Sequence, residues 1–287
     1  MIGRQTEVQK VIANIHKGQH TLLLGDVGMG KTYLLKQVAS QFDRTIYVES
    51  LSPLKPTLLD LISALHHNGD FIIEGIEAEY LSWDELYKKL NRLNIKELMS
   101  ALLANLQGKG YVLLLDHLET ATPSMAKKVL DLMKATTIIG AANKLKSNLK
   151  TLWWRFEPID LPPLNKEESK QLLWSLISKD NISDDKLLEH RVQNQANGNP
   201  LSIYELAEKV KREGNLTQEG IRELRHQAGV RFIDITPVFF IIGTLVIALR
   251  FIALGLNSTE LYILAGVSGG FFIGLRYFLY RSMRGDE

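Results

Sequence analysis

The stretch Gly25-Asp26-Val27-Gly28-Met29-Gly30-Lys31-Thr32 decides which fold we expect of this chain. It fits the pattern G-x-x-x-x-G-K-[ST], with a short apolar run before it and a helical pattern from Tyr33 after it. In such a strand–loop–helix unit, backbone N–H groups and the positive end of the helix face a phosphate chain. Lys31 would reach the terminal phosphates, and the Thr32 hydroxyl would take one position on Mg²⁺. The stretch, together with Tyr33, therefore predicts a binding site for a nucleoside triphosphate.

A second run, Tyr111-Val112-Leu113-Leu114-Leu115-Asp116, has the pattern of a strand that is buried on both faces and ends in a carboxylate. We expect it beside the P-loop strand, in an α/β fold whose parallel sheet is flanked by helices. Asp116 would then emerge at the carboxyl edge of the sheet, near Mg²⁺. The alternative is a buried strand that ends in an ordinary turn aspartate.

The residues after Asp116 leave the hydrolytic step open. Many ATPases place a second acid directly after the first, where it polarises the attacking water, but this chain has His117 at that position. Glu119 is the nearest carboxylate, so either Glu119 takes the role or turnover is slow. A later expected strand over 136–143 ends in Asn143, whose side chain could contact the γ-phosphate or orient water. Glu119 and Asn143 are therefore further candidate site residues.

The order of these parts resembles that of AAA+ ATPases, and within them the branch of STAND and archaeal origin-recognition ATPases. The resemblance covers about residues 2–212 and includes the segment 152–164, which reads Leu-Trp-Trp-Arg-Phe-Glu-Pro-Ile-Asp-Leu-Pro-Pro-Leu. Gly3-Arg4-x-x-Glu7 is similar to the N-terminal signature that lies against adenine in this branch. Gly198-Asn199-Pro200-Leu201 is similar to the lid motif that STAND proteins carry in place of a sensor arginine.

The resemblance implies ATP and Mg²⁺ as cofactors, with Arg4 and Pro200 close to the nucleotide and Asn143 as the polar sensor. It also implies a homo-oligomer, because Arg155 falls where AAA+ proteins hold an arginine finger for a neighbouring subunit. The alternative for Arg155 is local: it could interact with the last carbonyls of its helix or pair with Glu157. The chain departs from the family at His117 and in having no recognisable winged-helix domain after the lid.

The domain pattern predicts an ATPase core over 1–161, a helical lid over 162–212, a polar connector over 213–234 and a hairpin over 235–287. Two apolar runs, 235–256 and 261–280, are long enough to cross a hydrocarbon core of about 30 Å as transmembrane helices. The alternative is a pair of buried core helices. The short loop between the runs has no Lys or Arg, whereas the outer ends carry Arg222, Arg225, Arg231, Arg281 and Arg284. This bias predicts a multi-pass membrane protein of a prokaryotic inner membrane, with the ATPase domain and both termini cytoplasmic.

The composition excludes several kinds of site and function. The chain of 287 residues has no cysteine, which excludes disulfides, thiolate metal sites and a cysteine nucleophile, and its net charge of +2 does not favour nucleic acid. We therefore expect a membrane-anchored ATPase that drives assembly or conformational switching on a protein partner or on membrane lipid. One alternative is a membrane-tethered, DNA-associated ATPase, supported only by Lys144, Lys146 and Lys150. The other is an ATP-switched effector whose two-helix tail disrupts membranes.

Overall fold

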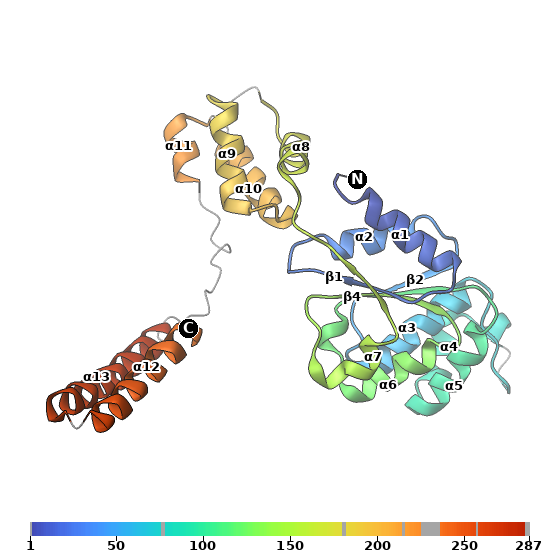
Figure 1. The fold of residues 1–287 in the computed structure, drawn as a ribbon. Helices are drawn as coiled ribbons and strands as arrows, with labels where there is room; N and C mark the ends of the chain where they lie inside the picture. The colour runs from blue at the N-terminus through green and yellow to red at the C-terminus, as the bar shows by residue number, and fades with distance from the viewer. Residues whose placement is uncertain are drawn as a thin grey trace. The chain divides into compact units, whose positions relative to one another are not determined.

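The α/β fold expected from the sequence is confirmed by the computed structural model. Within the described residues, parallel strands form one five-stranded sheet (Figure 1). Its order is β2 (Thr45–Val48), β3 (Val112–Leu115), β4 (Thr137–Ala142), β1 (Thr21–Leu24) and β5 (Glu157–Asp160). The carboxyl ends of all these strands meet at one edge, so the residues that follow them are brought together.

The structure describes residues 2–75, 78–179, 182–213, 216–224, 236–256 and 258–284, without the side chains of 236–240 and 273–284. The chain divides into two compact units, residues 1–229 and 230–287.

The strand that ends in Asp116 does not lie beside the P-loop strand, so this expectation was wrong. β4 lies between them, because Gly140 is paired with Leu22 of β1 on one side and with Leu115 of β3 on the other. The physical reason is that β4 is apolar and buried along almost all of its length, which suits a central strand. Gly140 also leaves room for the Leu118 side chain, which would clash with a Cβ at that position.

Helices cover both faces of the sheet (Figure 1). On one face lie α1 (Gln5–His16) and α2 (Lys31–Ala39). On the other lie α3 (Leu54–His67), α4 (Trp83–Leu90), α5 (Ile95–Leu106), α6 (Pro123–Leu132) and the short α7 (Lys150–Trp153). Alternate residues of β3 enter the two cores, Val112 and Leu114 on the first face and Leu113 and Leu115 on the second. Burial on both faces explains why the strand is apolar throughout.

The lid consists of α8 (Lys166–Leu176), α9 (Asp185–Ala196), α10 (Pro200–Glu213) and α11 (Gln218–Glu223), and it has a buried cluster of its own. The sequence predicted a polar connector from residue 213, but Leu216, Ile221 and Leu224 are buried in the lid cluster. The lid therefore continues past residue 212. These apolar residues are too few and too scattered among polar ones to give a helical pattern in the sequence. The rest of the expected connector, 225–234, lies outside the described residues.

The second unit is a helical hairpin of α12 (Thr236–Gly255) and α13 (Thr259–Arg284). Ala253 and Ala265 are buried between the helices, and a Cβ at Gly243 would lie 3.2 Å from the Phe272 ring. Over the part of the chain that the structure describes, no helix combines the length and the apolar character needed to cross a membrane. The expected transmembrane helices are not supported by this finding.

Candidate functional site

The P-loop forms a curled turn between β1 and α2. Gly28 and Gly30 have positive φ angles of 83° and 87°, a conformation that favours glycine. Lys31 is 7% exposed, and its Nζ donates to the carbonyl oxygens of Gly25 at 2.8 Å and Asp26 at 2.9 Å. Burial lowers the pKa of Lys31, while nearby carboxylates, led by Glu119, act in the opposite direction. The loop thus holds an ammonium group at the amino end of α2, where a phosphate chain would be bound.

Thr32 and Asp116 come from different elements and meet at the edge of the sheet. The Thr32 Oγ1 donates to Asp116 Oδ2 at 2.6 Å, and Asp116 is 1% exposed. The other Asp116 oxygen accepts the backbone N–H of His117 at 2.9 Å. A hydroxyl and a carboxylate oxygen beside a phosphate cradle fit Mg²⁺, which takes few protein ligands and keeps phosphate and water oxygens. Among the described residues, no cluster of three or more metal-binding side chains offers a different site.

Tyr47 is a site residue that the sequence analysis missed. Its hydroxyl donates to Asp116 Oδ2 at 3.1 Å from the neighbouring strand β2. Burial, and then the negative charge of Asp116, raise the pKa of Tyr47 to about 12. The bond helps to orient the carboxylate. No local pattern marks Tyr47, because its position depends on the pairing of β2 with β3.

His117, Glu119 and Asn143 form a connected polar group next to Asp116. The Glu119 side chain is buried in the 3₁₀ turn η2 (Leu118–Thr120), where its Oε1 accepts from Asn143 Nδ2 at 2.8 Å. Glu119 Oε2 accepts the Asn143 backbone N–H at 3.2 Å, and His117 Nδ1 lies 3.5 Å from Oε1. His117 has a φ of 50°, unusual for a residue with a side chain. Two hydrogen bonds therefore join the two candidate hydrolytic residues, Glu119 and Asn143, directly, and His117 lies beside the Glu119 carboxylate.

A pocket of about 870 Å³ lies between the P-loop and the lid. The polar side chains of Lys31, Thr32, His117 and Asn143 line the end at the P-loop. Its other lining residues include Ile2, Arg4, Leu164, Leu172, Ser175, Pro200, Leu201 and Tyr204. A pocket of this size with one polar and one mainly apolar end is suited to a nucleotide, with phosphates on the loop and the base among apolar side chains.

Arg4 and Pro200, the residues expected close to the nucleotide, both line this pocket. Arg4 is 5% exposed, and its Nη2 donates to the carbonyl oxygens of Met29 at 3.3 Å and Pro162 at 2.6 Å. Its Nη1 lies 3.6 Å from Glu7 Oε1. Arg4 thus connects the P-loop to the segment that leads into the lid. Ile2, Leu164, Leu172 and Tyr204 were missed as lining residues, since single apolar residues carry no signal until the lid is placed.

Arg155 lies away from the other site residues. It is exposed after α7 and does not line the pocket of its own chain. The neighbouring Trp154 is 76% exposed, and the Lys150 Nζ lies 5.1 Å from its ring centre. Arg155 could therefore act at a nucleotide only if that nucleotide were bound to another copy of the chain.

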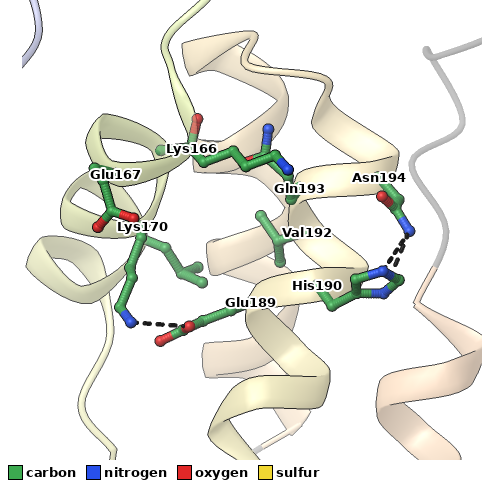
Figure 2. A pocket seen from close by; sticks show the side chains of 10 residues that line it. Lys166, Glu167, Lys170, Glu189, His190, Val192, Gln193 and Asn194 are labelled. Carbon is green, nitrogen blue, oxygen red and sulfur yellow. Dashed lines mark hydrogen bonds and ion pairs between the residues drawn. The ribbon is translucent and has the colours of Figure 1, made fainter.

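A second pocket, of about 290 Å³, lies within the lid between α8 and α9 (Figure 2). Lys170 Nζ lies 3.0 Å from Glu189 Oε2, and the Trp174 indole donates to the other oxygen of Glu189 at 2.7 Å. Asn194 Nδ2 lies 3.3 Å from His190 Nδ1. The contacts of Lys170 and Trp174 with Glu189 join α8 to α9, whereas the contact between His190 and Asn194 lies within α9.

Comparisons with known proteins agree with this geometry. A family model described as an AAA domain matches residues 14–145. The Walker-type ATPase of Pyrococcus abyssi is similar in structure, with a TM-score of 0.52 and 15% identity over 91% of this chain and 77% of that one. No curated protein is significantly similar in sequence.

Two further structures are similar at lower scores. A STAND protein with a tetratricopeptide repeat sensor from Pyrococcus horikoshii has a TM-score of 0.47 and 17% identity, over 71% of this chain. This chain spans only 29% of that protein. The Thermotoga maritima RuvB Holliday junction branch migration motor has a TM-score of 0.45 and 19% identity, over 77% of this chain and 68% of that one. Residues 14–145 are thus similar to an AAA domain, and the first unit has the fold of a P-loop ATPase.

Proposed function

We propose that this chain binds ATP with Mg²⁺ and hydrolyses it. The observation that carries the proposal is the meeting of Lys31, Thr32 and Asp116 at one edge of the sheet, under a loop curled by glycines. The P-loop N–H groups and Lys31 would bind the β- and γ-phosphates, and Thr32 and Asp116 would hold Mg²⁺, which neutralises the charge that develops on the phosphates.

The polar group around Glu119 supports a hydrolytic role rather than binding alone. His117 and Asn143 line the pocket, and both interact with the buried Glu119 carboxylate. A carboxylate held in this way can orient a water molecule, or orient the side chains that contact that water. We assign Glu119 to this step, with Asn143 fixing its position.

Replacing Lys31 tests nucleotide binding. Lys31→Ala removes one charge from a preorganised phosphate site, so the affinity for ATP should fall at least about tenfold, as expected for a lost charge-assisted hydrogen bond. The measurement is calorimetric titration with ATP and Mg²⁺. Lys10→Ala is the control, since Lys10 is an exposed lysine on α1 that does not line this pocket. Unchanged affinity in Lys31→Ala would contradict the proposed site.

We also infer that the hairpin associates with lipid. Large apolar side chains on α12 are more than half exposed: Ile241, Leu245 and Ile252 lie on one side, and Ile247, Phe251 and Leu254 lie on another. The two groups lie on different sides of the helix because successive residues of an α-helix are rotated by about 100° around its axis. A single protein partner covers one stripe of a helix, whereas lipid can cover several sides at once.

Vesicle flotation of the full chain tests this inference. The wild type should float with vesicles that contain anionic lipid. The double substitution Ile247→Glu and Phe251→Glu should lower the bound fraction at least about tenfold, because each carboxylate opposes insertion. Ile72→Glu is the control, since Ile72 is 72% exposed in the first unit. Wild-type protein that stays with the unbound fraction would contradict lipid association.

A further inference from the structure

The lid contacts the P-loop directly, through the turn Gly198-Asn199-Pro200-Leu201. The Asn199 Nδ2 donates to the Val27 carbonyl oxygen at 2.8 Å. Next to it, the Leu201 backbone N–H donates to the Gly28 carbonyl oxygen at 3.2 Å. The carbonyls of two consecutive P-loop residues therefore accept hydrogen bonds from the lid, one from the Asn199 side chain and one from the Leu201 backbone.

The same Asn199 amide also caps α10. Its Oδ1 accepts the N–H groups of Leu201 at 3.0 Å and Ser202 at 3.3 Å, which are among the first N–H groups of the helix. A primary amide has both an acceptor oxygen and a donor nitrogen. One side chain can thus hold the start of the helix and the loop of the core together, which an aspartate cap cannot do because an ionised carboxylate has no donor.

The P-loop is shaped to receive this turn. Gly28 occupies a position that the motif leaves free, but a Cβ there would lie 2.5 Å from Asn199 Oδ1 and 2.8 Å from Leu201 Cβ. Its φ of 83° also favours glycine. On the far side of the turn, the Gly198 carbonyl accepts the Leu164 N–H at 2.8 Å. The turn is therefore bonded both to the P-loop and to the segment that joins core and lid.

We propose that Asn199 is a positioning residue that couples the lid to the phosphate site. The Val27 carbonyl belongs to the same peptide group as the Gly28 N–H, and N–H groups of this loop are the ones that would bind phosphate. Hydrogen bonds at both ends of one peptide group strengthen each other. Bound phosphate thus strengthens the contact with the lid and, reciprocally, the contact slows release of the nucleotide. The proposal rests on the proposed binding of ATP.

The substitution Asn199→Asp separates the two roles of the amide. Asn199→Asp keeps the acceptor that caps α10 but loses the donor to Val27 and places a carboxylate next to that carbonyl. Asn199→Ser is a second variant, since a serine can cap the helix but has no amide. Asn194→Asp is the matched control: it makes the same change in the lid, on α9, where Asn194 contacts His190 (Figure 2).

The test measures how fast the full chain releases a fluorescent ATP analogue, mant-ATP. Both Asn199 variants should release it roughly five- to tenfold faster than wild type, as expected for one lost hydrogen bond, while Asn194→Asp stays close to wild type. Nucleotide should also slow amide hydrogen exchange at Leu201 in the wild type but not in Asn199→Asp. Wild-type release rates in both Asn199 variants would overturn the coupling and leave ATP binding intact. A wild type that fails to bind mant-ATP would instead overturn the proposed function.

Discussion

At the scale of single residues, the site depends on side chains that contact one another before any ligand is considered. Asp116 accepts hydrogen bonds from Thr32, Tyr47 and the His117 backbone, so its carboxylate is held in one orientation. Glu119 is held in the same way by Asn143. Groups that are oriented in advance need little rearrangement when charge develops on a phosphate. This favours a role for both carboxylates in catalysis or metal binding over a purely structural one.

Glu119→Gln tests the residue assigned to the hydrolytic step. The amide keeps the shape of the side chain but removes the negative charge, so ATP should still bind while turnover falls about 100-fold, as expected for loss of a general base. Single-turnover hydrolysis and equilibrium binding of ATP separate the two effects. Hydrolysis at the wild-type rate would show that another group positions the water, and His117, which also lines the pocket, would be the first candidate.

At the scale of elements, an ionic cluster joins the segments that enter the sheet. Asp70 follows α3, and its Oδ2 accepts from the Tyr111 hydroxyl at 2.7 Å. Arg44, just before β2, and Lys109, just before β3, each lie 3.6 Å from its carboxylate. The hydrogen bond from Tyr111, and then the charges of Arg44 and Lys109, lower the pKa of Asp70 from its ordinary value of 3.8. The cluster therefore stabilises the fold only while Asp70 is ionised.

The pH dependence of this contribution has a definite sign. A carboxylate whose pKa is lower in the folded state stabilises the fold above its unfolded pKa, and this contribution is lost as the pH falls through the folded pKa. Asp70→Asn should therefore lower the free energy of unfolding at pH 7 but have little effect once the pH is well below 3.8. Urea unfolding at a series of pH values measures this difference.

Asp131→Asn is the control for that series. Asp131, on α6, pairs at 2.9 Å with Lys134, which follows the helix at the surface, and such surface pairs contribute only about 0–1 kcal/mol. An equal loss of stability at neutral and acid pH in Asp70→Asn would contradict the ionic explanation. The cluster would then act through the shape and hydrogen bonds of the side chain alone.

At the scale of the whole molecule, Arg155 bears on assembly. It is exposed and outside the pocket of its own chain, so a role at the γ-phosphate requires a second copy. We expect ATP to favour a higher oligomer than ADP. Arg155→Ala should bind ATP normally but lose ATP-driven assembly, or lose hydrolysis by roughly 1000-fold, the contribution typical of an arginine finger. Light scattering with each nucleotide and a turnover assay measure the two outcomes.

Arg92→Ala is the matched control for assembly, since Arg92 is an exposed arginine after α4, far along the chain from Arg155. A single mass for the wild type with ATP, ADP or no nucleotide, together with normal hydrolysis by Arg155→Ala, would contradict the finger. The chain would then be better described as a monomeric nucleotide switch whose lid moves at the turn 198–201.

Much of the site could be predicted from the sequence because its chemistry is local. The P-loop needs spaced glycines, a lysine and a threonine between a strand and a helix, and these occur within one short stretch. Asp116 and Asn143 could be predicted for a related reason: each ends a strand, and parallel strands end at one edge of the sheet. The start of α8 is determined by local chemistry as well, because Asn165 and Glu168 cap it through reciprocal hydrogen bonds.

Only the tertiary structure decided how these pieces meet. It placed β4 between β1 and β3, because strand order depends on which apolar faces pack together and not on order along the chain. It brought Tyr47 to Asp116 through strand pairing, and it brought Asn199 to the Val27 carbonyl across 172 residues. The sequence by itself determined which groups can bind a triphosphate, since that depends on residue type and local spacing. The partners that hold those groups in place depended on long-range packing, which leaves no local pattern to detect.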